Sequence, residues 1–138
     1  GINGRMDTLQ AAILLEILKV FPDEVARRQE IGERYNTGLT NLNGIETPAI
    51  SKHNTSVFAQ YTILSENREA IQSILKEKGI PSVSYYSVPL HLQPVFGNLG
   101  HEGGDFPVSE KVSSQCLSLP MSPYLSEEDQ LKSVDAFR

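Results

Sequence analysis

The chain has 138 residues, of which 39% are hydrophobic and 21% charged, and its formal net charge is −5. A chain of this length can bury about two thirds of the surface that its unfolded form exposes, so one compact domain is expected. The acidic balance argues against sequence-independent nucleic-acid binding, which needs clustered lysine and arginine. No apolar run reaches the roughly 18 residues of a membrane span. We therefore expect a cytoplasmic protein that binds neither nucleic acid nor membrane.

A long helical arm is predicted at the start of the chain. Asp7 and Gln10 have the spacing of a capping box, so a helix should begin there. Apolar residues then recur at every third or fourth position, which gives the helix one apolar face. Pro22 removes a backbone donor and should kink or restart the helix. Residues 1–42 are thus expected to form a bent arm, and residues 43–138 a small α/β domain.

This second part is predicted to contain a three-stranded sheet covered by helices. Strands are indicated by runs of β-branched and aromatic residues, and helices by apolar residues at helical spacing and by capping residues such as Ser126. The expected strands are 56–64, 82–86 and 116–119, and the expected helices are 68–78, 107–115 and 126–137. Gly79 should end the first of these helices in a left-handed conformation. Residues 87–105 should form a long loop, and loops of that length are often functional.

Two groups of residues could carry chemistry. Asn3 and Arg5 precede a helix N-terminus, where amides, the helix dipole and a guanidinium can together hold a phosphate or a carboxylate. Tyr85, Tyr86 and His91 stand at the end of a predicted strand and could project into a cleft. The alternatives are a solvated leader for the first group and, for the second, tyrosines that pack on opposite faces of a strand with the histidine held by backbone groups. The residue types alone leave both alternatives open.

No lysine is predicted to be a Schiff-base nucleophile. All six lysines fall on charged helix faces or in a polar loop, away from the desolvated surroundings that a catalytic lysine needs. Cys116, the single cysteine, has no neighbouring base or metal ligand and is expected to be a buried, inert thiol. His53 and His101 lack further ligands at metal-binding spacing, so no metal site is expected.

Five blocks of the sequence, taken in order, carry a resemblance to a known family. They are GINGRMDTLQAAIL, ARRQEIGERYNTGL, FAQYTIL, YYSVPLHLQPVF and GDFPVSEKVSSQCLSLPMSPYLSEEDQ. Together they resemble the C-terminal segment of the DegT/DnrJ/EryC1 family of sugar aminotransferases, over nearly the whole chain. Because the chain also opens without an initiator methionine, a piece of a longer protein is expected.

The resemblance implies the small C-terminal α/β (α+β) domain of a fold type I, aspartate aminotransferase-like enzyme. Members of this family are homodimers with active sites at the subunit interface. They transfer an amino group, usually from glutamate, to a keto group on a nucleotide-linked sugar, with pyridoxal 5'-phosphate (PLP) as the cofactor. The PLP-binding lysine belongs to the larger N-terminal domain. The resemblance therefore implies an enzyme of amino-sugar or polysaccharide biosynthesis, and an isolated chain that is inactive.

The resemblance also assigns roles to matching residues. Asn3 is similar to the asparagine that reaches the cofactor phosphate of the neighbouring subunit. Arg5 matches an arginine that, in members acting on uronic acid sugars, is placed to pair with the sugar carboxylate. Tyr86 and His91 match a block near the sugar, whereas Tyr85 stands where relatives with acidic sugars often have histidine. A serine also replaces the proline that usually follows, so the sugar's identity stays open.

Two interpretations of other classes remain. The chain could be a stand-alone, non-catalytic sugar-binding or dimerisation module that kept the sugar-facing surface. It could instead be a small regulatory domain whose resemblance is coincidental, although five ordered blocks argue against this. Upstream sequence with a lysine-bearing cofactor motif would separate the aminotransferase interpretation from both.

Overall fold

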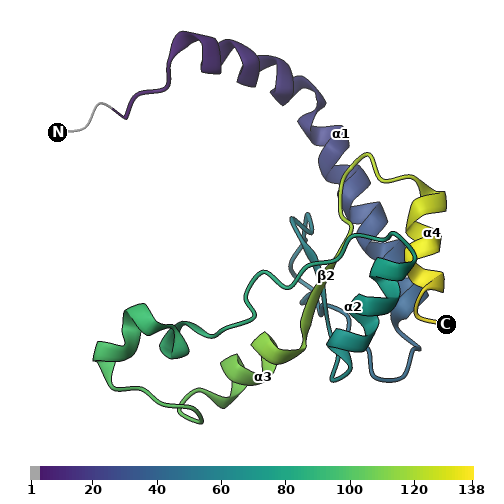
Figure 1. Ribbon diagram of the computed structural model, residues 1–138. Coiled ribbons are helices and arrows are strands. Elements are labelled where there is room, and N and C mark those ends of the chain that lie inside the picture. Colours follow the sequence, from purple (N-terminus) through teal and green to yellow (C-terminus); the bar gives the residue numbers. More distant parts are fainter. Residues whose placement is uncertain (1–3) are drawn as a thin grey trace.

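The computed structural model describes residues 4–138. Its elements, in chain order, are α1 (Thr8–Leu39), β1 (Tyr61–Leu64), α2 (Arg68–Glu77), the short 3-10 helices η1 (Leu90–Leu92) and η2 (Pro94–Leu99), α3 (Pro107–Gln115), β2 (Cys116–Leu119) and α4 (Glu127–Asp135). Figure 1 shows the sheet, α2, α4 and the C-terminal half of α1 gathered in one body. The N-terminal half of α1 and the segment with η1 and η2 extend from that body.

Helix α1 is one continuous helix that runs through Pro22. The expected capping box is confirmed, because the Gln10 amide donates to the Asp7 carboxylate at 2.8 Å and the Gln10 side chain accepts from the Asp7 amide. Of the two effects expected at Pro22, the structure has a bend and no restart (Figure 1). Proline removes one backbone hydrogen bond, and here the position is exposed, so water can satisfy the freed carbonyl.

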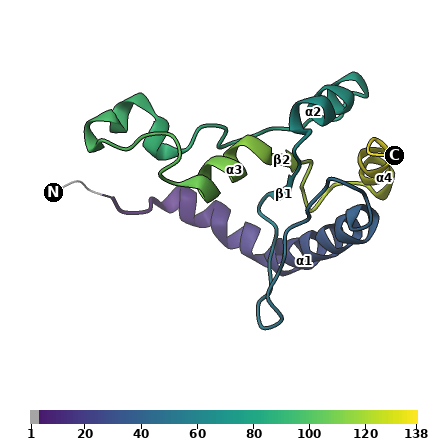
Figure 2. The ribbon, with the colours of Figure 1, turned by 90° about the horizontal axis from the view of Figure 1, so that it is seen from below.

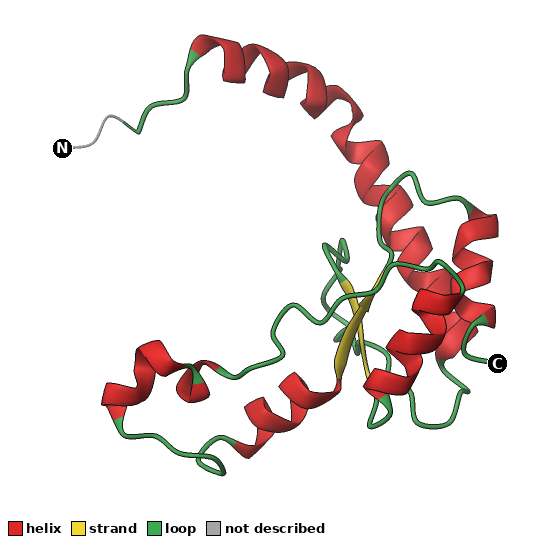
Figure 3. Cartoon of the chain, in the orientation of Figure 1, coloured by secondary structure: helices red, strands yellow, loops and turns green. Residues whose placement is uncertain are grey.

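The sheet has two strands among the described residues, where three were expected. Strands β1 and β2 pair antiparallel along their whole length, between α2 and α3 in Figure 3. The expected strand at 82–86 is wrong: only Val83 bridges Ser118, through backbone hydrogen bonds of 3.1 and 2.8 Å. Residues 85–86 already form a turn, so the chain leaves the edge of the sheet after a single bridge.

The first strand begins at Tyr61, later than expected, because of the backbone at Phe58. This residue has φ of 44°, in the left-handed region that interrupts an extended strand. Arg28 donates to the Phe58 carbonyl at 3.2 Å, and the Phe58 amide donates to the Ser56 hydroxyl at 3.1 Å. The ring lies over Gly32, where an added Cβ would be 2.3 Å from it. Side-chain contacts thus hold a conformation that residue propensities do not predict.

The core lies between the sheet, α2, α4 and the C-terminal half of α1. Its largest fully buried side chains include Tyr35, Leu39, Tyr61, Ile63, Leu75 and Leu117. The rings of Tyr35 and Tyr61 stack with centroids 4.7 Å apart, and their hydroxyls donate to the Pro120 carbonyl at 2.9 Å and to the Asn36 side chain at 2.6 Å. Burial raises the pKa of Tyr35 to about 12. The division of the chain at residues 42 and 43 stays a prediction.

The remaining helices are close to their expected bounds. Helix α3 and strand β2 begin and end as predicted, and α2 ends at Glu77, one residue early. Gly79 has φ of 70°, and the next amide donates to the Leu75 carbonyl at 2.8 Å, as in a left-handed helix cap. Ser126 caps α4 by accepting from the Asp129 amide at 3.1 Å. None of the helices within residues 4–138 has the length and apolar character that crossing a membrane requires.

Candidate functional site

The first group of predicted site residues lies at the start of α1. Asn3, the predicted cofactor-binding residue, falls outside the described residues. Arg5 is exposed and stands just before the helix. It borders a hollow of about 480 Å³ whose other lining residues are Gly4, Met6, Gln10, Ile13 and Leu14. A guanidinium beside apolar side chains and a helix N-terminus can hold an anion that also carries an apolar face.

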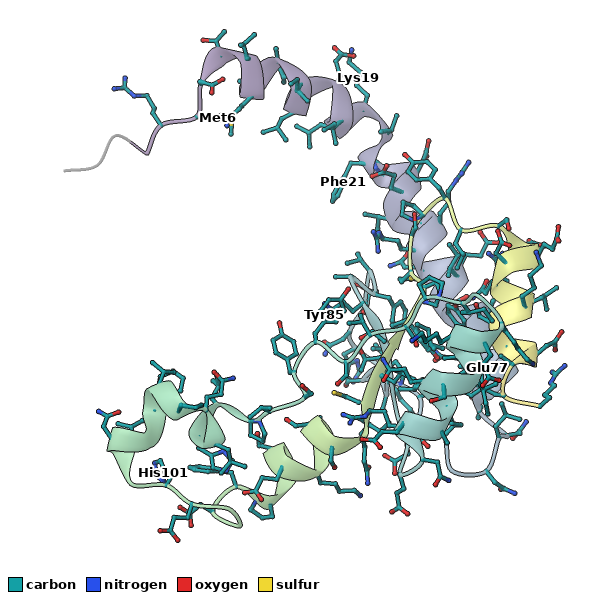
Figure 4. All side chains as sticks on the ribbon, viewed as in Figure 1. Met6, Lys19, Phe21, Glu77, Tyr85 and His101 are labelled. Carbon is teal, nitrogen blue, oxygen red and sulfur yellow. The ribbon has the colours of Figure 1, made fainter. Side chains whose placement is uncertain are left out.

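Tyr85 and Tyr86 lie in the turn that follows the Val83 bridge. Their side chains are 56% and 73% exposed, so they do not pack on the two faces of a strand as the alternative had it. Figure 4 shows Tyr85 on the segment that connects the sheet to η1. Both phenol groups are therefore available to bind a ligand. Behind them, the Ser84 hydroxyl lies 3.3 Å from the sulfur of Cys116, which is buried as expected.

His91 lies in η1, and its side chain is only 8% exposed. Its Nε2 is 3.0 Å from a carboxylate oxygen of Glu110, and its ring contacts the ring of Phe106 with centroids 4.8 Å apart. The alternative of a histidine held by backbone groups is thus replaced by a histidine held by a carboxylate. A side chain this buried can reach a ligand only through an edge of its ring.

Glu110 is the functional candidate that the sequence did not indicate. It lies in the first turn of α3 and accepts from the Gly104 amide at 2.9 and 3.0 Å and from the Phe106 amide at 3.3 Å, in addition to His91. The Gly104 amide, followed by the other donors, lowers the pKa of this carboxyl below its ordinary 4.5. An acidic residue just after Pro107, in a first helical turn, was the one signal that could have drawn attention to it.

A second histidine lies beside this cluster. His101 is 3.4 Å from Asp105 and meets the edge of the Phe106 ring, with centroids 5.0 Å apart. The backbone amide of Glu102 lowers the pKa of the Asp105 carboxyl. The part of the chain that the structure describes contains no group of three histidine, cysteine or carboxylate residues that could hold a metal ion.

The lysines occupy the positions expected of them. All six side chains are exposed, and Lys19 and Lys132 pair with neighbouring carboxylates on their own helices. Within residues 4–138, no lysine has the desolvated surroundings that a Schiff-base nucleophile needs. The exposed lysines of these described residues do not fit the covalent attachment of PLP.

Among residues 4–138, the predicted site residues form two groups that are not in contact. No hydrogen bond or ion pair among residues 4–138 links Arg5 to Tyr85, Tyr86 or His91. Figures 1 and 2 show the start of α1 and the segment with η1 and η2 extending to the same side of the body. The side chains that could bind a ligand thus lie on the two parts of the chain that leave the core.

Comparison with known proteins finds relatives with similar sequences and structures. The chain is 46% identical over 125 residues to a UDP-2-acetamido-2-deoxy-3-oxo-D-glucuronate aminotransferase of Pseudomonas aeruginosa, covering 91% of this chain and 34% of the relative. A DegT DnrJ EryC1 StrS aminotransferase from Brucella abortus is 47% identical and matches with a TM-score of 0.90, over 100% of this chain and 36% of that one. A Bacillus subtilis protein crystallised with bound cofactor PMP, ntda, is 30% identical, with a TM-score of 0.87 over 99% of this chain and 33% of that one.

These matches confirm the expected fold, a mixed helical domain with a small antiparallel sheet, as found in aminotransferase structures. The chain spans about a third of the length of the relatives that it matches. All of residues 1–138 match one family description. The chain belongs to the DegT/DnrJ/EryC1/StrS aminotransferase family.

Proposed function

We propose that this chain is part of an enzyme that transfers an amino group to a keto group on a nucleotide-linked sugar, with PLP as the cofactor. The family match over residues 1–138 carries the proposal, and the bound PMP of the Bacillus subtilis neighbour supports the cofactor. When bound, PLP supplies the electron sink for amino transfer. The exposed lysines support a chain that is inactive alone and that works with a PLP-binding lysine elsewhere in the polypeptide.

The substrate that we propose is a UDP-linked keto sugar with a carboxylate, of the uronic acid type. The name of the Pseudomonas aeruginosa relative describes such a substrate, and Arg5 offers an exposed guanidinium beside a hollow. A guanidinium binds a carboxylate through two parallel hydrogen bonds, a geometry that a hydroxymethyl group cannot match. Arg5 would thus distinguish acidic from neutral sugars.

The other predicted residues would make the remaining contacts with the cofactor and the sugar. Asn3 would hold the cofactor phosphate of the neighbouring subunit in a homodimer. Tyr85 and Tyr86 have exposed hydroxyls and rings that can donate to sugar oxygens or stack on a flat face, and His91 would present one ring edge to the sugar. Glutamate as the amino donor, a role in polysaccharide biosynthesis and a cytoplasmic location belong to the same proposal.

The N-terminal half of α1 supports the proposed homodimer. Its exposed apolar side chains are Leu9, Ile13, Leu14, Leu15, Ile17, Leu18, Val20 and Phe21. Contiguous apolar surface of this kind is typical of a protein interface. Figure 4 shows Phe21 on α1, and the chain from Lys19 back to Met6 extends away from the body.

The first test is to express the gene that encodes this chain and to measure the visible absorbance of the product with PLP. The proposal expects a PLP-bound protein whose absorbance changes on adding glutamate and recovers on adding the UDP-linked keto sugar, with the amino sugar as product. A colourless product that binds the nucleotide sugar without converting it would favour a non-catalytic sugar-binding module instead.

The substrate is tested by replacing the guanidinium. Arg5→Gln should lower kcat/KM for the carboxylate sugar by about 10- to 100-fold, because a charge-assisted contact is lost. The same variant should leave kcat/KM for the matching neutral sugar nearly unchanged. Arg138→Gln, at an exposed arginine that pairs with Asp135, is the control. Equal losses on both sugars would refute a contact with the carboxylate.

A further inference from the structure

The segment of residues 87–106, here called the lobe, has few packing contacts of its own. Leu90, Val95 and Leu99 are 67%, 72% and 60% exposed, whereas Pro89 and the His91 side chain are buried. Hydrophobic packing thus holds only the start of the lobe. Polar contacts to its neighbours hold the rest.

One side chain outside the lobe, that of Glu110, makes these polar contacts. The Glu110 carboxylate accepts from His91 near the start of the lobe and from Gly104 and Phe106 at its end. The Phe106 ring completes the cluster by contacting both His91 and His101. Glu110 thus joins the two ends of the lobe to the first turn of α3, and α3 leads directly into strand β2 of the core.

The same contact determines which nitrogen of His91 carries a hydrogen. An ionised carboxylate can only accept, so the nitrogen that faces Glu110, Nε2, must be the donor. In the neutral imidazole the hydrogen therefore lies on Nε2, and Nδ1 keeps its lone pair. Among residues 4–138, Nδ1 has no hydrogen-bond partner. A ligand hydroxyl could donate to it.

We propose that Glu110 is a positioning residue, which fixes the lobe on α3 and holds His91 with Nδ1 as an acceptor for a hydroxyl of the sugar substrate. The contact with the sugar rests on the function proposed above. The fixing of the lobe and of the tautomer does not, because it depends only on contacts within this chain. Glu110 itself touches no substrate.

The test uses the whole gene product and the variant Glu110→Gln, which has nearly the same shape. An amide can donate as well as accept, so it no longer dictates the tautomer of His91, and its NH₂ group opposes one of the backbone donors. Glu102→Gln is the matched control, since Glu102 is an exposed carboxylate in the same lobe whose side chain makes none of these contacts.

Three measurements are made on each protein. The ¹⁵N shifts of the His91 imidazole, assigned with His91→Gln, report the tautomer. Hydrogen exchange of the Gly104 and Phe106 amides reports the fixing of the lobe. The third measurement compares the half-reaction with glutamate and the half-reaction with the keto sugar, each followed by cofactor absorbance. A residue that only stabilised the fold would not separate these two half-reactions.

In Glu110→Gln we expect His91 to show a mixture of tautomers and the Gly104 and Phe106 amides to exchange at least about tenfold faster. We expect kcat/KM of the sugar half-reaction to fall by about tenfold and that of the glutamate half-reaction to stay unchanged. Unchanged spectra and exchange would overturn the proposal. Altered exchange with an unchanged sugar half-reaction would also overturn it, and would reduce Glu110 to a helix cap. If the wild-type protein shows no reaction with cofactor, the proposed function fails, and the spectra and exchange still decide whether Glu110 positions the lobe.

Discussion

The two halves of α1 have similar apolar faces and opposite surroundings. In the C-terminal half, Ile31, Tyr35 and Leu39 are buried against the sheet and α4. In the N-terminal half, Leu9 is 79% exposed and Ile13 62% exposed. Apolar periodicity predicted both faces equally well. Apolar periodicity indicates which side of a helix is apolar enough to be buried. It does not say whether the same chain or another protein surface buries that side.

The lobe resembles the N-terminal half of α1 in this respect. Both expose large apolar side chains, and both carry predicted ligand-binding residues: Arg5 precedes the helix, and His91 lies in the lobe. The core, in contrast, carries none of the predicted substrate contacts. This division fits a domain whose core supports two binding parts that other protein surface completes.

The largest expected effect follows from truncating the same side chain at the two ends of α1. Leu39→Ala removes a fully buried side chain and should lower the free energy of unfolding by about 2–5 kcal/mol. In the monomer, Leu9→Ala should change it by less than about 0.5 kcal/mol, since the side chain is exposed in the single chain and alanine is a good helix former. Urea denaturation of both variants measures the difference. Equal losses would mean that the N-terminal half is covered in solution, and a concentration-dependent loss in Leu9→Ala would identify a second copy as the cover.

A smaller loss is expected where the core is too tight to admit a methyl group. An added Cβ at Gly32 would lie 2.3 Å from the ring of Phe58, so Gly32→Ala must displace a buried ring. The cost should be about 1–3 kcal/mol, even though alanine favours a helix more than glycine does. Gly97→Ala is the control, because an added Cβ there meets no atom within 4 Å. A stabilised Gly32→Ala protein would show that Phe58 moves freely, contrary to its packed position.

Much of the fold could be predicted because local signals coincide with tertiary structure. The capping box at Asp7, the glycine cap at Gly79 and the serine cap at Ser126 each identified a helix end. The errors in the sheet lie at two aromatic residues. Phe58, a residue type with high strand propensity, is in the left-handed conformation because tertiary contacts override propensity, and Tyr85 lies in an exposed turn after a single bridge.

The candidate site was harder to predict than the fold. Motif resemblance selected Arg5, Tyr85, Tyr86 and His91, and the structure adds that the two tyrosines are exposed and that His91 is held by a carboxylate. Glu110 was missed because its partners lie 4 to 19 residues away along the chain, across an irregular loop. No sequence periodicity connects such residues, so their contacts can be recognised only from the folded conformation of the loop.

The burial of Tyr35 in the core predicts that the protein loses stability at high pH. Burial raises the pKa of Tyr35 from 10.0 to about 12, because the ionised phenol is poorly solvated in the core. A raised pKa in the folded state means that this stability is complete below pH 10 and is lost as the pH rises from 10 toward 12. Tyr35→Phe removes the ionisation and should cost about 1–2 kcal/mol at neutral pH, since the Pro120 carbonyl loses its donor. Unfolding free energies measured across this pH range should fall more steeply for wild type than for the variant.

The smallest effect is expected in the lobe at low pH, and it should be local. The pKa of Glu110 lies below 4.5 in the folded chain, so its contribution is complete above pH 4.5 and is lost as the pH falls through the lower value. Protonation gives the carboxyl a hydrogen of its own and weakens its contacts with the Gly104 and Phe106 amides, whose exchange should accelerate relative to the core. The neighbouring Asp105, beside His101, titrates in the same direction, so Asp105→Asn and Glu110→Gln are needed to separate the two carboxyls. An acid transition that survives in Glu110→Gln and disappears in Asp105→Asn would assign the opening of the lobe to the His101 pair, and the comparison between core and lobe would then depend on a different contact.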